Sequence, residues 1–157
     1  MNPQEVNIEE IKIEDNYVNY KGERLIMQTK WLPTYFMSKY KTLKVMLTKE
    51  EDILKILKDV DKKISEYLPD KCKQTIIVKK YEEREFVRPK YKYTKIYDED
   101  KKEISLNELE KPNIECRYIF TVSPIRRYQN YYGSHVKCLQ IQVRQKTKEE
   151  LPCMFDD

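Results

Sequence analysis

The sequence has 157 residues, of which 39% are hydrophobic and 37% charged, and its formal net charge is +4. This length suits one domain with a buried core, and the composition is that of a soluble globular protein with a highly charged surface. The chain has only two glycines, which excludes Gly-rich phosphate-binding loops, and no apolar run approaches the roughly 20 residues that cross a bilayer.

The N-terminal part is predicted to begin with strands. Residues 1–16 contain five acids and one lysine and lack the apolar segment of a secretory signal, so we expect the protein in a reducing, intracellular compartment. Apolar residues between Val6 and Ile13 predict an opening strand. Residues 24–29 and 42–47 are rich in apolar and β-branched side chains and predict two further strands.

Residues 48–69 form the one convincing helix of the sequence. Thr48 and Glu51 have the spacing of a capping box, and Pro69 ends the segment. Apolar side chains recur along it at helical spacing, at Ile53, Leu57, Val60, Ile64 and Tyr67. The opposite, lysine-rich face is expected to be solvated.

Four more strands are predicted after the helix, over residues 74–81, 91–97, 115–122 and 135–145. Residues 98–113 form a polar insertion, expected as a loop with a short helical turn. About seven short strands with a single helix between the third and the fourth predict a mainly β fold, a small β-barrel. We expect one domain over residues 1–148 and a flexible acidic tail over residues 149–157.

The sequence offers few residues for catalysis or for a metal. Its four cysteines contain no C-x-x-C pair and its one histidine is His135, so we expect no metal site and no cofactor. Cys116 and Cys138 fall in predicted strands and are expected to be buried thiols. Because no catalytic constellation around His135 can be assembled, we predict a binding protein rather than an enzyme.

Two segments, residues 79–95 and 123–137, interleave cations with aromatic rings. Single-stranded nucleic acid needs cations for its phosphates and exposed rings for its bases, and arginine can both pair with phosphate and stack. No acid occurs from Arg117 to Lys148, where seven basic residues do. The predicted phosphate contacts are Lys79, Arg84, Arg88, Lys90, Arg126, Arg127, Lys137 and Arg144. The predicted base-stacking residues are Tyr91, Tyr128, Tyr131 and Tyr132.

Each of these assignments has a plainer alternative. Lysine and tyrosine are enriched as in any chain from an AT-rich genome, and residues 123–137 can be an ordinary Tyr-rich hairpin. About half of the aromatic residues in alternating strands face the core, so Phe120 is expected there, and Trp31 is equally compatible with core or rim. The tyrosines beside Gly133 are better candidates for stacking, because a hairpin tip cannot bury all of them.

The order of motifs resembles the OB-fold single-stranded-DNA-binding proteins of nucleocytoplasmic large DNA viruses, relatives of phage-type replication proteins. RLIMQTKWLPTYFM (24–37) resembles the family's early strand and Pro-containing segment, and ILKILKDVDKKI (53–64) resembles its mid-barrel helix. The C-terminal half is similar to the family's order of basic strand, acidic insertion, strand, one-glycine turn and final strand. The resemblance implies an OB-like barrel that binds single-stranded DNA without sequence preference in viral replication or recombination.

The acidic end EELPCMFDD (149–157) is similar to the C-terminal tails of many such proteins. The resemblance implies that Phe155, Asp156 and Asp157 contact replication partners. An acidic end can also occupy a basic groove until a polyanion displaces it. The alternative is a frayed polar terminus, which is common at chain ends.

We therefore predict a non-enzymatic protein whose partner is single-stranded DNA, with no membrane contact and with self-association left open. The resemblance places it in the host cytoplasm or nucleus, or in the virion. Two other functions remain open: a virion structural or minor capsid β-barrel, and a small metal-dependent nuclease.

Overall fold

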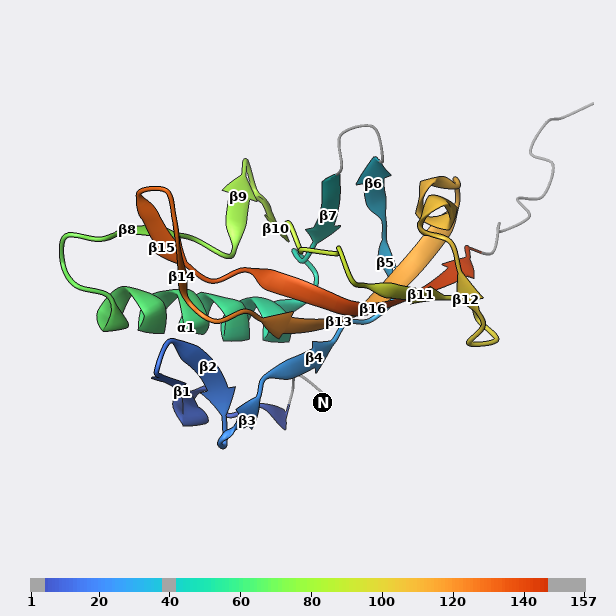
Figure 1. The fold of residues 1–157 in the computed structure, drawn as a ribbon. Helices are drawn as coiled ribbons and strands as arrows, with labels where there is room; N and C mark the ends of the chain where they lie inside the picture. The colour runs from blue at the N-terminus through green and yellow to red at the C-terminus, as the bar shows by residue number, and fades with distance from the viewer. Residues whose placement is uncertain (1–4, 38–41, 147–157) are drawn as a thin grey trace, which may run out of the picture.

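The structure is a computed structural model that describes residues 5–37 and 42–146. Short strands make up most of its regular structure, and the single α-helix of the described residues, α1 (Glu51–Tyr67), lies between the early and the late strands (Figure 1). The predicted mainly β class with one helix in this position is confirmed. The strands are β1 (Ile11–Glu14), β2 (Tyr17–Tyr20), β3 (Glu23–Arg24), β4 (Ile26–Gln28), β5 (Leu32–Pro33), β6 (Tyr35–Met37), β7 (Thr42–Met46), β8 (Lys73–Thr75), β9 (Lys79–Tyr81), β10 (Arg84–Val87), β11 (Lys95–Tyr97), β12 (Glu103–Ile104), β13 (Ile114–Val122), β14 (Arg126–Tyr128), β15 (Tyr131–Gly133) and β16 (Val136–Gln145).

The described strands pair into four sheets around two long central strands. β13 and β16 have nine and ten residues, run antiparallel, and cross the middle of the molecule in Figure 1. They belong to a six-stranded sheet of order β12-β11-β16-β13-β4, in which β5 also pairs with β13. The other sheets have the orders β1-β2-β3, β6-β7-β10-β9 and β14-β15-β8.

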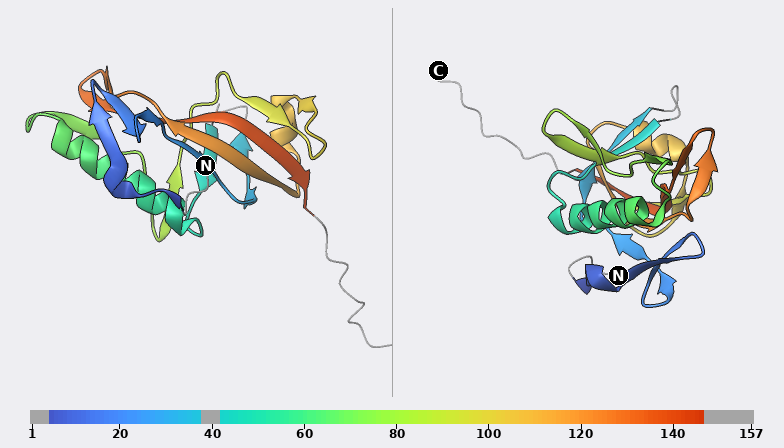
Figure 2. Two further views of the ribbon diagram at one scale, coloured as in Figure 1. Left: turned by 90° about the horizontal axis from the view of Figure 1, so that it is seen from below. Right: turned by 90° about the vertical axis from the view of Figure 1, so that its left-hand side faces the viewer.

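Helix α1 lies between the N-terminal sheet β1-β2-β3 and the remaining strands (Figure 2). Its apolar residues at helical spacing, Ile53, Leu57, Val60 and Ile64, are fully buried, as predicted. Tyr67, the last residue of the predicted stripe, is 42% exposed, and its hydroxyl bonds Asn16 instead of entering the core. Within the described residues, no helix has the length and apolarity needed to span a membrane.

The predicted capping box at the start of α1 is wrong. The helix begins at Glu51 after the N-cap residue Glu50, which makes no side-chain cap hydrogen bond. The Thr48 hydroxyl instead accepts a hydrogen bond from the backbone N–H of Glu85, with a donor–acceptor distance of 3.2 Å. A tertiary contact with β10 therefore occupies the Thr48 hydroxyl, which the local sequence pattern had assigned to capping the helix.

The core contains the aromatic and thiol side chains that the strand pattern placed there. Phe120 is fully buried and its ring stacks on Tyr118, with 5.5 Å between the ring centroids. Cys116 and Cys138 are buried thiols, and burial raises their pKa values to about 11 and about 12. Both thiols therefore remain protonated near neutral pH, which is the behaviour of packing residues.

The strand predicted over residues 74–81 is interrupted by a side chain from the helix. Asp61 is buried, and its carboxylate accepts hydrogen bonds from the backbone N–H groups of Ile77 and Val78, at 2.8 and 3.1 Å. Burial raises the pKa of Asp61, and the two N–H donors oppose that shift. Because these donors are satisfied by Asp61 rather than by a neighbouring strand, the segment divides into β8 and β9.

We predict that Asp61→Ala lowers the free energy of unfolding by about 2–4 kcal/mol, because two N–H groups in a dry setting lose their acceptor. Urea denaturation of the variant measures this loss. Lys62→Ala changes the next residue, which is exposed, and is the matched control, expected to stay within about 0.5 kcal/mol of the parent. Equal effects of the two substitutions would show that Asp61 does not hold the β8–β9 segment.

Candidate nucleic-acid interface

A small hollow lies between the β8–β10 region and the start of β16. It has a volume of about 180 Å³ and is called here the basic hollow. Its charged side chains are Lys79, Arg88 and Lys90, all of them cations. The other lining residues are Thr75, Ile76, Ile77, Val87, Ser134, His135 and Val136.

The cations of the basic hollow flank the β9–β10 hairpin. Lys79 opens β9, Arg88 follows β10 directly, and Lys90 lies in the segment that leads to β11. The backbone of Lys90 is fixed to β16, because its N–H donates to the Val136 carbonyl and its carbonyl accepts from Cys138 N–H, both at 2.9 Å. Lys137 pairs with Lys90 in an isolated parallel bridge and is exposed, so it adds a further cation beside the hollow.

His135 forms part of the wall of the basic hollow. Its ring packs edge-on against Tyr128, with 4.6 Å between the ring centroids, and its Nε2 atom is buried without a hydrogen-bond partner among the described residues. Burial, followed by the charges of Lys90 and Lys79, lowers the pKa of His135 below its ordinary value of 6.5. The imidazole is therefore neutral at pH 7.

A phosphate bound in the basic hollow would offset the two lysine charges and raise the pKa of His135. Binding would then take up a proton, so we predict that affinity for single-stranded DNA rises as pH falls from about 7.5 to about 5.5. The free protein should lose stability over the same fall, because its folded state favours the neutral imidazole. Fluorescence anisotropy of labelled oligo-dT measures the first effect.

His135→Gln is the control for this pH dependence, because glutamine does not titrate and His135 is the one histidine of the chain. The affinity of this variant is expected to vary little over the same pH range. A variant that kept the full pH dependence would show that another group is responsible.

The hairpin of β14 and β15 presents exposed tyrosines next to the hollow. Its register pairs Arg126 with Gly133, Arg127 with Tyr132, and Tyr128 with Tyr131. Tyr128 and Tyr131 are 41% and 47% exposed, and Tyr132 is half-buried. The hairpin therefore combines cations and accessible rings on two short strands, which is the combination that bases and phosphates of a single strand require.

A parallel pair holds this hairpin in place. β15 runs beside β8, and Gly133 is the partner of Thr75, which also lines the basic hollow. A Cβ atom on residue 133 would lie 2.9 Å from both the Cβ and the carbonyl oxygen of Thr75, so glycine allows the two strands to approach. Lys73 on β8 lies over the Tyr131 ring, 5.9 Å from its centroid, and adds a cation beside that ring.

Two predicted site residues on the hairpin are exposed cations. Arg126 and Arg127 are both exposed, and the Arg127 guanidinium lies 5.9 Å from the centroid of Tyr132. Arg127 also donates from Nε to the carbonyl of Gln129 in the turn, at 2.8 Å. The structure thus brings together Lys79, Arg88, Lys90, Lys137, Arg126, Arg127, Tyr128, Tyr131 and Tyr132 around the hairpin and the hollow.

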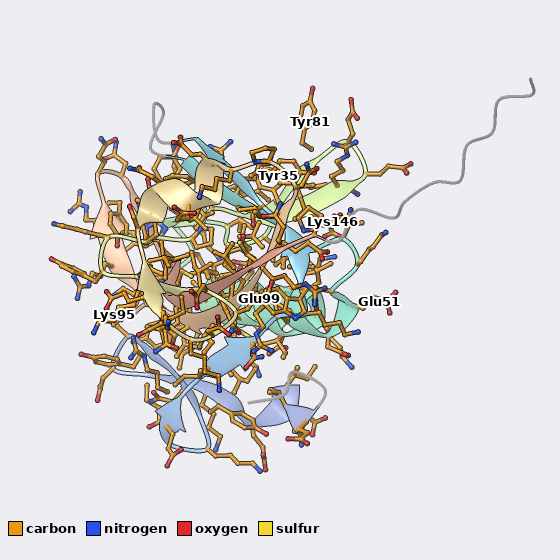
Figure 3. All side chains as sticks on the ribbon, turned by 90° about the vertical axis from the view of Figure 1, so that its right-hand side faces the viewer. Tyr35, Glu51, Tyr81, Lys95, Glu99 and Lys146 are labelled. Atoms are coloured by element: carbon orange, nitrogen blue, oxygen red, sulfur yellow. The ribbon has the colours of Figure 1, made fainter. Side chains whose placement is uncertain are left out.

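The remaining predicted residues lie elsewhere. Arg84 is exposed near the tip of the β9–β10 hairpin, opposite Tyr81, whose side chain is 67% exposed and projects from the body of the protein (Figure 3). Tyr91 is half-buried and its ring meets Phe36 edge-on at 5.6 Å, so it packs against the core. The predicted tail residues Phe155, Asp156 and Asp157 lie outside the described residues.

Arg144 also lies away from the basic hollow, near the C-terminal end of β16. Its guanidinium is 3.0 Å from the carboxylate of Glu115 and 4.3 Å from the ring centroid of Trp31. The sequence has no acid between Arg117 and Lys148, so it did not indicate this ion pair. Glu115 lies just before that stretch, on the neighbouring strand β13. Trp31 is half-buried beneath the Arg144 guanidinium. Of the two positions that the sequence left open, core and rim, it occupies the rim.

Sequence reasoning missed two groups that shape the candidate site. The sequence pattern indicated no binding role for His135 and no role for Lys73 or Thr75. A parallel contact between strands distant in sequence brings Lys73 and Thr75 to the site, and no local pattern reports such a contact. Within the described part of the chain, no three His, Cys, Asp or Glu side chains are grouped to hold a metal ion.

Solved structures of a phage protein share this fold. The single-stranded DNA-binding protein from bacteriophage Enc34 aligns with a TM-score of 0.55 at 8% identity, over 92% of this chain and 93% of that one. Its C-terminal truncation aligns with a TM-score of 0.56 at 9% identity, over 88% and 94%. The chain therefore has the OB-like fold that was predicted. No protein-family model and no curated protein matches the sequence.

Proposed function

We propose that this protein binds single-stranded DNA with little sequence preference, through the basic hollow and the β14–β15 hairpin. Lys79, Arg88 and Lys90 contact phosphates in the hollow, while Tyr128 and Tyr131 stack on bases beside it. The observation that carries the proposal is the gathering of these cations, which flank the β9–β10 hairpin, next to exposed rings on the β14–β15 hairpin. Neither feature alone is specific, but single-stranded nucleic acid requires both.

The shared fold supports this proposal. The phage protein of the same fold is by name a single-stranded DNA-binding protein, and its alignment extends over nearly the whole of both chains. Stacking on tyrosine accepts any base, because every base has a flat aromatic face. We therefore propose binding that depends on exposed bases and on salt, not on sequence.

We further propose that the protein acts in viral DNA replication or recombination, as a relative of the proteins of nucleocytoplasmic large DNA viruses. The motif order over residues 24–143 supports this kinship. On this proposal, residues 149–157 recruit replication partners through Phe155, Asp156 and Asp157, and the protein works in the host cytoplasm or nucleus. Removal of residues 149–157 should then abolish partner capture and leave DNA binding intact or stronger.

A competition experiment tests the proposed function. Labelled oligo-dT bound to the full chain is challenged with unlabelled oligo-dT, a matched duplex and single-stranded RNA. We expect oligo-dT to compete at least tenfold better than the duplex, because stacking requires unpaired bases. Equal competition by duplex and single strand would contradict the proposal and would indicate binding to phosphates alone.

A further inference from the structure

The outer face of the six-stranded sheet carries a second, larger hollow of about 400 Å³, called here the sheet-face hollow. It extends over β4, β11, β13 and β16, and its charged side chains, Lys101 and Arg117, are both cations. The remaining lining residues are Gln28, Tyr97, Ile119, Gln140, Ile141 and Gln142. None of these residues belongs to the basic hollow or the β14–β15 hairpin.

Strand alternation explains why these side chains share one face. On β13, Cys116 and Tyr118 are buried, so Arg117 and Ile119 point to the opposite, outer face. On β16, the buried residue Ile141 alternates in the same way with Gln140 and Gln142. The outer face of the sheet therefore presents the apolar side chain of Ile119, the aromatic ring of Tyr97 and three amides. The amides belong to Gln28, Gln140 and Gln142.

Arg117 is held in position on this face. Its Nε donates to Oε1 of Gln142 at 2.6 Å, and the Gln142 amide in turn donates to the carbonyl of Asp98 at 3.1 Å. The Arg117 guanidinium also lies 4.9 Å from the ring centroid of Trp31. The hydrogen bond from Nε fixes the orientation of the guanidinium. Its other N–H groups make no hydrogen bond to residues that the structure describes, so they can contact a phosphate.

We propose that the sheet-face hollow is a second contact surface for single-stranded nucleic acid, occupied by one or two nucleotides. A base rests against Tyr97 and Ile119, glutamine amides bond its edge, and Arg117 and Lys101 contact the flanking phosphates. Amides supply both donors and acceptors, so they suit base edges, and the cationic charge of the hollow matches phosphate. This proposal rests on the proposed function and extends it to a second site.

The two surfaces are connected by one strand. Lys137 lies beside the basic hollow and Gln142 in the sheet-face hollow, and their separation of five residue steps on β16 corresponds to roughly 16 Å at about 3.3 Å per residue. A single strand that occupies both surfaces therefore follows β16 across the molecule. We expect a longer oligonucleotide to bind more tightly than one that fills a single surface.

Trp31 provides a selective reporter of the sheet-face hollow, since it is the only tryptophan of the chain and contacts Arg117. The full chain is titrated with labelled oligo-dT while anisotropy reports binding and indole-selective excitation reports Trp31. We expect Trp31 fluorescence to change with the same midpoint as anisotropy. Arg117→Ala should weaken binding roughly three- to tenfold and lower the salt slope by about 0.7.

Gln140→Glu is a second variant that places a negative charge on the exposed face without removing a packed group, and it should weaken binding to a similar extent. Asn19→Asp, the same charge change on the N-terminal sheet, is the matched control and should bind as the parent does. Binding with unchanged Trp31 fluorescence and parent-like affinity of both sheet-face variants would overturn this inference and leave the proposed function intact. Absence of any anisotropy change would instead overturn the proposed function.

Discussion

Replacing Lys79, Arg88 and Lys90 together with alanine is expected to weaken binding of single-stranded DNA by roughly 100-fold. This figure assigns about 1 kcal/mol to each lost phosphate contact, or about 3 kcal/mol in total. The slope of log affinity against log salt should become shallower by about 2, because each neutralised phosphate contributes about 0.7. Anisotropy titrations at several salt concentrations measure both quantities.

A second triple variant tests whether binding depends on where the three cations lie or only on the net charge of the protein. Lys12, Lys55 and Lys62 are exposed lysines on β1 and α1, and replacing them removes the same charge from other faces of the protein. This variant is expected to keep most of the parent affinity, since screening limits the reach of distant surface charges. If both triple variants lost affinity and slope equally, binding would depend on overall charge and the basic hollow would not be a site.

Tyr131→Ala is expected to weaken binding by about 1–3 kcal/mol while the salt slope stays unchanged, because it removes a stacking surface and no charge. Tyr131 is 47% exposed on β15, so the substitution should cost little stability. Tyr131→Phe keeps the ring and should retain the parent affinity. The measurement is the same anisotropy titration, with urea denaturation to confirm folding.

Tyr17→Ala is the matched control for this substitution. Tyr17 is 56% exposed on β2, in the N-terminal sheet, and is expected to have no effect on DNA binding. A Tyr131→Phe variant as weak as Tyr131→Ala would show that the hydroxyl, not the ring, matters. Parent-like affinity of Tyr131→Ala would remove this residue from the binding surface.

Local periodicity predicted the helix and the longest strands of this fold, and it missed short strands such as β2 and β10. The helical spacing of Ile53, Leu57, Val60 and Ile64 reflects one buried face. Period-two alternation along β13 and β16, interrupted by a bulge between Ile119 and Phe120, reflects strands with one face in the core. Such patterns follow from side-chain burial, which each segment records in its own sequence. Loops and strand ends were less accurate, because contacts such as Asp61 with Ile77 come from another element.

The candidate site was predictable only in part, for the same physical reason. The hairpin with Tyr128 and Tyr131 forms from neighbouring residues, so its composition was visible as a cluster. The basic hollow requires Lys90 to pair with β16 and β8 to pair with β15, contacts between distant segments. Arg144 shows the opposite error, since it was predicted to contact phosphate. Its own segment contains no acid, but Glu115 on the adjacent strand β13 pairs with it.

Photochemical cross-linking of oligo-dT that carries a photoreactive thymidine tests the central claim most directly. Mass spectrometry of the cross-linked full chain identifies the residues in contact with the bases. We predict cross-links on the β14–β15 hairpin, at Tyr128 and Tyr131, and in the segments that line the basic hollow. Cross-links confined to α1 or to the β1-β2-β3 sheet would place the nucleic acid on another face and contradict the account.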